Sequence, residues 1–315
     1  MVPILVGSSN PACAVEVLKS VPRTNARNWV FLGDSLTEGV GSKRISHVGE
    51  LVKQLRTTGE ISVHEFRLRR MESAGLNQQI ESNVAGLMNV DERQGSSDVW
   101  LWNLACEGRT IESDFEWLPF INTLRPELVV IFRGSLESII RPAMSCDGDW
   151  PWWVPQSWRG YAAMDPRCYF SATWWRKAKQ TSVDRLKQSM RLRLLKRRAG
   201  KPLMDVDLLA SYQTELLKRL RALGARVLVL GLLPVDQSRF PSSPEQFKVV
   251  NARLRQIATA EGVEFFDWAS LLPSNGKLGG LFYRDSFHPN AAGANALAEI
   301  LHQYLSHNKA QQAGK

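Results

Sequence analysis

Short apolar runs, each closed by glycine, proline or polar residues, recur along the 315-residue chain. They occupy residues 29–32, 100–104, 128–132, 227–233 and 263–266 and show no alternation of apolar and polar positions. Such runs are typical of parallel strands that helices cover on both faces. The sequence therefore predicts five buried strands, and Val63–Leu68 is a candidate edge strand.

Between these runs the apolar positions follow helical spacing. Tyr212–Leu223 places four leucines on one face and is followed by Gly224, a common signal for the end of a helix. Further helices are predicted over 46–56, over 291–305, and from Ser243 to Ala260, with Ser243 as N-cap. The alternation of strands and helices favours an α/β fold with a mostly parallel sheet between two helical layers.

Two segments, residues 59–97 and 141–204, interrupt this alternation, and we interpret them as insertions into a single domain spanning residues 1–315. The second insertion holds 14 Lys and Arg against 4 Asp and Glu, whereas the rest of the chain holds 26 against 27. It also contains six of the eleven tryptophans. An amphipathic basic helix is predicted over 183–198, and the segment is expected to fold back as a lid.

Either this helix is a surface helix with a solvated cationic face, or it binds an anionic partner. An acidic acyl-carrier protein, a coenzyme A thioester or an anionic membrane surface would each suit its charge. No nucleic acid is expected, because the sequence carries no recognisable nucleic-acid-binding motif.

Other classes are disfavoured by composition. The chain has no run of 18 apolar residues that could span a membrane, and its start is a poor signal peptide, so a cytoplasmic protein is expected. Cys13, Cys106, Cys146 and Cys168 lie far apart, which predicts reduced thiols rather than a zinc site or a disulfide framework. No metal or organic cofactor is implied.

The first predicted strand ends on Gly33-Asp34-Ser35-Leu36. In open parallel sheets, ligands bind outside the carboxyl ends of strands, so the Ser35 hydroxyl is a candidate nucleophile. A serine nucleophile needs a base and a group that orients the base. Asp285 and His288 have a suitable spacing on one loop, although a serine after a strand is more often a turn residue and His288 could instead cap the next helix.

Three motifs together resemble the SGNH, or GDSL, hydrolase family. They are GDSL at Gly33–Leu36, NLACEG at Asn103–Gly108 and D-x-x-H at Asp285–His288, in the family's order. The resemblance covers most of residues 28–305 outside the two insertions.

This resemblance implies a flavodoxin-like three-layer α/β/α sandwich. It also implies Ser35 as nucleophile, His288 as general base and Asp285 as its orienting partner. The backbone N–H groups of Ser35 and Gly108 would form part of the oxyanion hole.

One block departs from the family pattern. Gly134–Glu137 reads GSLE where the family has G-x-N-D, so Leu136 replaces an asparagine that donates to the oxyanion. Loss of one such donor costs roughly 10² to 10³ in turnover. Three explanations remain: a neighbour (Arg109, Arg133, Ser135 or Ser138) donates instead, two donors suffice for a reactive acyl group, or the protein binds without turnover. We favour the first two.

Four residues are candidates for substrate binding: Asp34, Arg109, Arg133 and Glu137. Arg133 directly follows the strand predicted over 128–132, where its guanidinium could hold a substrate carboxylate or phosphate. Alternatively, it is solvated or paired with Glu137.

The function expected from these features is hydrolysis of a carboxylic ester or thioester through an acyl-enzyme on Ser35. Transfer of the acyl group to an acceptor other than water is the first alternative. The second is a catalytically weak protein that docks an acidic partner through the basic insertion.

Overall fold

The structure is a computed structural model that describes residues 27–39, 45–57, 63–67, 99–168, 172–197, 200–272 and 280–313, with backbone alone in 63–67 and 308–313. Its central sheet has six parallel strands in the order β2-β3-β1-β4-β7-β8. The strands are β1 (Arg27–Gly33), β2 (Val63–Arg67), β3 (Val99–Asn103), β4 (Leu128–Phe132), β7 (Arg226–Leu230) and β8 (Glu264–Phe266). The five predicted strands and the edge strand are confirmed.

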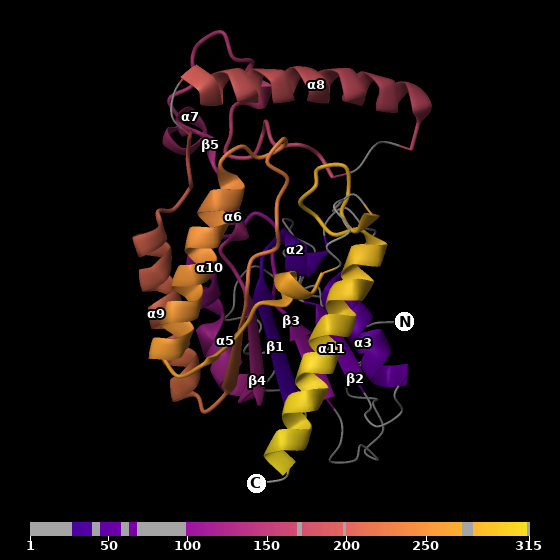
Figure 1. Ribbon diagram of the computed structural model, residues 1–315, viewed down its shortest axis with the longest axis vertical. Coiled ribbons are helices and arrows are strands. Elements are labelled where there is room, and N and C mark those ends of the chain that lie inside the picture. The colour runs from indigo at the N-terminus through magenta and orange to yellow at the C-terminus, as the bar shows by residue number, and fades with distance from the viewer. Residues whose placement is uncertain are drawn as a thin grey trace, which may run out of the picture.

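Without the edge strand β2, the strands follow the order 2-1-3-4-5, which is that of flavodoxin-like folds. The chain adds β3 on one side of β1 and then β4, β7 and β8 on the other, so crossovers of one hand place the helices on opposite faces. Figure 1 shows α3 (His47–Thr57) beside α11 (Ala291–Ala313) on one side of the sheet. On the other side lie α5 (Leu118–Leu124), α9 (Val206–Ala222) and α10 (Ser243–Ala260). The predicted three-layer class is confirmed.

Helix α11 runs on to Ala313, past the predicted end at 305, and the starts of two other helices differ from the prediction because of capping. Helix α9 begins six residues before Tyr212, since the Asp205 side chain accepts a hydrogen bond from the Leu208 N–H at 2.7 Å. Helix α10 has Ser242 rather than Ser243 as its N-cap. The Ser243 hydroxyl is not available for capping because it accepts from the Ile140 N–H at 3.0 Å.

The basic insertion leaves and rejoins the fold at one place. Strands β5 (Arg141–Pro142) and β6 (Gly200–Lys201) pair antiparallel at its two ends. Between them lie α7 (Ala143–Asp147), the 3₁₀ turn η2 (Gln156–Trp158) and α8 (Trp174–Arg197), which begins nine residues before the predicted basic helix. Met144, Val154, Met164 and Leu194 form a small separate core beneath α8.

The insertion lies at the carboxyl end of the central sheet. Figure 1 shows α8 beyond the carboxyl ends of the strands, on the side where α2 (Ser35–Glu38) and α6 (Ser135–Ser138) follow β1 and β4. Of the other insertion, residues 59–97, only β2 falls within the described residues. No helix in the described part of the chain is long and apolar enough to cross a membrane.

Candidate active site

Ser35 lies at the carboxyl end of β1, one of the two central strands, at the start of α2. Asp34 caps this short helix, because its Oδ1 accepts from the Leu36 N–H at 2.9 Å. A side chain at Gly33 would collide with Thr37, whose Oγ1 lies 2.1 Å from the position of an added Cβ. The Gly-Asp-Ser sequence therefore turns the chain tightly and leaves Ser35 half-buried at the sheet end.

Asp285 and His288 lie on the loop before α11, and Asp285 organises that loop. Its Oδ1 accepts from the backbone N–H groups of Phe287 and His288, each at 3.1 Å. Its Oδ2 accepts from His288 Nδ1 at 2.6 Å. Asp285 is buried, so this carboxylate fixes the imidazole from below.

The structure brings Ser35 and His288 together across 253 positions of the sequence. Ser35 Oγ lies 2.9 Å from His288 Nε2. Because the Asp285 carboxylate accepts the proton on Nδ1, Nε2 is the free acceptor for the serine proton. The three side chains thus form a hydroxyl–imidazole–carboxylate chain with the geometry of a catalytic triad.

The Gly108 loop runs beside the Ser35 turn. The ladder between β1 and β3 extends past the strands, with the Cys106 N–H donating to the Gly33 carbonyl at 3.1 Å. Gly108 has a φ of +70°, which favours glycine, and it is exposed. Within the described residues its N–H has no acceptor, so it is available to a ligand at this end of the sheet.

Arg133 is not a substrate clamp, which corrects the expectation from sequence. It is buried, and its guanidinium forms a two-pronged pair with Asp114, with N···O distances of 2.8 and 2.5 Å. Asp114 lies in the 3₁₀ turn η1 (Ile111–Trp117). The remaining Nη1 donates to the carbonyl of Arg109 at 2.6 Å, so Arg133 anchors the loop that carries Gly108.

Asp34 and Glu137 are also buried and so are not placed to bind substrate. Glu137 Oε1 accepts from the Ile111 N–H at 2.7 Å, which makes it a second anchor of the Gly108 loop. Burial raises the pKa of Glu137 to about 7, against the opposing effect of Arg133. Burial likewise raises the pKa of Asp34, which Arg133 partly offsets.

The residues that could replace the missing oxyanion donor at Leu136 differ in how accessible they are. Ser135 and Ser138 are buried, and Arg133 is occupied by Asp114. Arg109 keeps a side chain that is 31% exposed, with a 3.9 Å contact to Glu116. Of the sequence-predicted substrate residues, Arg109 alone remains accessible.

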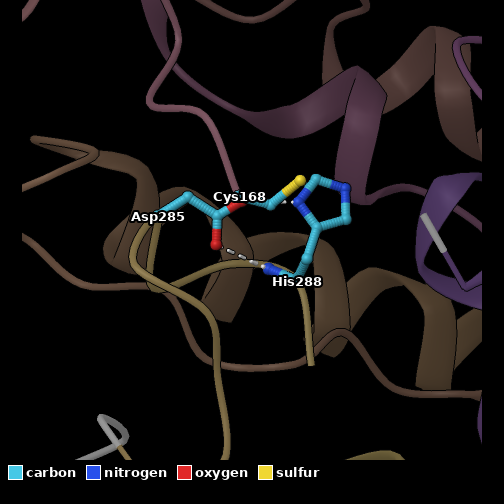
Figure 2. A group of neighbouring side chains, drawn as sticks. All are labelled: Cys168, Asp285 and His288. Carbon is cyan, nitrogen blue, oxygen red and sulfur yellow. Dashed lines mark hydrogen bonds and ion pairs between the residues drawn. The ribbon is translucent and has the colours of Figure 1, made fainter. Parts of the chain in front are cut away.

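The insertion reaches the site at two points that the sequence did not predict. Cys168 lies against the Asp285–His288 pair, as Figure 2 shows. Asp184 of α8 lies 2.9 Å from Nη1 of Arg284, which directly precedes Asp285. No local spacing links these residues, since only the folding of the insertion brings them to the loop.

Cys168, Asp285 and His288 also form a group of potential metal ligands, with their ligand atoms within 4.8 Å of one another. Both ring nitrogens of His288 are already engaged, one by Asp285 and one by Ser35. This bonding fits a proton-transfer pair, and a metal would have to break it.

Comparison with known proteins supports the resemblance through the part of the chain that holds the D-x-x-H motif. Residues 195–296 match the model of the GDSL-like lipase/acylhydrolase family, which confirms the resemblance. The match includes Asp285 and His288, and Ser35 lies before it. No curated protein matches the sequence.

Three solved structures illustrate the similarity in chain path. TesA is 17% identical, with a TM-score of 0.46 over 87% of this chain and 96% of its own. An acetyl xylan esterase, AlAXEase, is 14% identical, with a TM-score of 0.47 over 88% and 98% of the two chains. The lipase/acylhydrolase from Enterococcus faecalis is 13% identical, with a TM-score of 0.48 over 90% and 96%.

Replacing Arg133 with methionine tests its structural role. The change leaves the Asp114 carboxylate buried and unpaired, so we expect the free energy of unfolding to fall by about 3–5 kcal/mol in denaturant titrations. Arg109→Met removes an exposed cation and should cost less than about 1 kcal/mol. Adding Asp114→Leu to Arg133→Met should recover part of the loss. Equal losses for the two arginine variants would contradict the assignment.

Proposed function

Because residues 195–296 match the GDSL-like lipase/acylhydrolase family, we propose that this chain hydrolyses a carboxylic ester or thioester through an acyl-enzyme on Ser35. The observation that carries the proposal is the pair of contacts at His288, 2.9 Å to Ser35 Oγ and 2.6 Å to Asp285 Oδ2. A serine and a histidine without a shared role would not be expected to lie in one series of hydrogen bonds with a buried carboxylate.

In the first step, Ser35 Oγ attacks the acyl carbon while its proton moves to His288 Nε2. Asp285 stabilises the resulting imidazolium and keeps Nε2 directed at the serine. The tetrahedral intermediate collapses, and the leaving alcohol or thiol takes the proton from Nε2. Water then repeats the sequence: it gives a proton to Nε2 and attacks the acyl carbon, and Ser35 Oγ takes that proton back as the second tetrahedral intermediate collapses to the free acid.

The negative oxygen of the intermediate needs donors that are fixed in advance. The N–H groups of Ser35 and Gly108 are the two proposed donors, and Arg133 and Glu137 hold the Gly108 loop in place. With Leu136 unable to donate, the Arg109 guanidinium is the third donor that we propose. Its weak contact with Glu116 leaves it free to turn toward a bound substrate.

Two alternatives use the same residues differently. An acyltransferase would pass the acyl group from Ser35 to an alcohol or amine, and product analysis separates it from a hydrolase, because transfer yields a new ester or amide in place of free acid. A weak binding protein would keep the fold without turnover. The unbroken series of hydrogen bonds from Ser35 through His288 to Asp285 favours catalysis over binding without turnover.

Turnover of p-nitrophenyl esters tests the proposal. Ser35→Ala and His288→Ala should each lower kcat by about 10³ or more, because the triad acts as a unit. Matched controls are Ser211→Ala and His302→Ala, which change one serine and one histidine on α9 and α11 and should leave kcat unchanged. A Ser35→Ala protein that retains wild-type turnover would refute serine catalysis.

A second set of variants tests the third donor. Arg109→Met should lower kcat by about 10² with little change in KM, because the lost donor acts only on the transition state. Glu116→Gln serves as control, since it breaks the ion pair and keeps the guanidinium. Unchanged turnover in Arg109→Met would exclude Arg109 as the donor and leave a two-donor site suited to reactive acyl groups.

A further inference from the structure

Helix α8 has an outward face that is strongly cationic. The helix contains nine Lys and Arg residues and a single acid, Asp184. Its first turns, residues 174–179, are exposed throughout, and further along the exposed basic residues are Arg185, Arg193, Lys196 and Arg197. Within the described residues, Lys179 and Arg185 take part in no ion pair.

The other charged side chains of α8, Asp184, Lys187 and Arg191, lie on its inward face. The Asp184 side chain is 9% exposed, with its oxygens 2.9 Å from Arg284 Nη1 and 3.5 Å from Arg167 Nε. Lys187 and Arg191 are buried, and Lys187 donates to the Ala163 carbonyl at 2.9 Å. Because the one acid is turned inward and paired, the outward face carries cations without a compensating acid of the same helix.

Four tryptophans of the same insertion are left in solvent. Trp152 is 88% exposed and Trp174 is 79% exposed, and Trp153 and Trp175 are about half exposed. The apolar side of α8 is already used, because Leu194 packs in the small core of the insertion. Within the described residues, the rings of Trp152, Trp153 and Trp174 make no aromatic or cation contact, and the Arg176 guanidinium lies 5.0 Å from the centre of the Trp175 ring.

We propose that the outward face of α8, together with Trp152, Trp153, Trp174 and Trp175, docks on an anionic membrane surface. Lys and Arg gain energy from the negative potential of anionic headgroups. Tryptophan suits the same boundary, because its ring is apolar and its N–H is polar. Exposed rings beside cations therefore favour the lipid headgroup region over a partner that offers acidic charge alone.

Docking through this surface would bring the active-site end of the sheet to the membrane. Figure 1 shows α8 beyond the carboxyl ends of the strands. The contact between Asp184 and Arg284 ties the helix to the loop that holds Asp285 and His288. The docking itself does not require the proposed chemistry, so it is tested by binding rather than turnover.

Co-sedimentation with vesicles tests the surface, using the full chain with Ser35→Ala so that no lipid is consumed. We expect the protein to pellet with phosphatidylcholine vesicles that contain phosphatidylglycerol, and much less with phosphatidylcholine alone. Added salt should release it. Tryptophan emission should shift to shorter wavelength on binding.

Paired variants separate charge from aromatic contacts. Lys179→Glu with Arg185→Glu should weaken binding roughly tenfold or more. Lys218→Glu with Lys248→Glu makes the same change of net charge on α9 and α10 and should have little effect. Trp152→Ala with Trp174→Ala keeps every charge and should weaken binding several-fold, while circular dichroism verifies that each variant is folded.

Two results would overturn the proposal. The first is equal binding by the two charge-reversal pairs, which would mean that net charge alone drives sedimentation. The second is vesicle binding that the tryptophan changes leave intact and that soluble polyglutamate abolishes. That pattern would assign the surface to an acidic protein partner.

Discussion

The hydrogen bond between Ser35 Oγ and His288 Nε2 joins a strand near the start of the chain to a loop near its end, and the proposed chemistry depends on it. Two features of the fold impose the contact. The order of the sheet places β1 in the middle, where the direction of the winding changes and ligands bind in such folds. The loop before α11 reaches this point, and its shape is set by hydrogen bonds from two backbone N–H groups to the Asp285 carboxylate.

A buried set of charges supports this arrangement from beneath. Arg133 and Asp114 pair out of reach of water, and together with Glu137 they hold the loop that carries Gly108. A buried pair of this kind contributes little net stability compared with apolar packing, but its geometry is strict. We interpret these charges as a scaffold that fixes backbone donors, which explains why Arg133, Asp114 and Glu137 lie behind the site instead of in it.

The sequence predicts the strands, most helices and the three motifs because each depends on local spacing: apolar runs for buried strands, glycine and serine at a strand end, and D-x-x-H on a loop. The sequence leaves the role of Arg133 open, because its partner Asp114 lies 19 residues earlier in a 3₁₀ turn that no periodicity marks. The place of Cys168 is not predictable for a similar reason, since only the folded insertion brings it beside His288. Pairing between distant segments is what the sequence patterns leave out.

The most direct measurement is the site of covalent labelling by a fluorophosphonate, located by mass spectrometry of the digested protein. An activated serine attacks phosphorus, and a spectator serine does not. The account predicts one adduct, on the peptide that contains Ser35, and its loss in the His288→Ala protein and in denatured protein. An adduct on another serine, or labelling of Ser35 that persists without His288, would contradict the account.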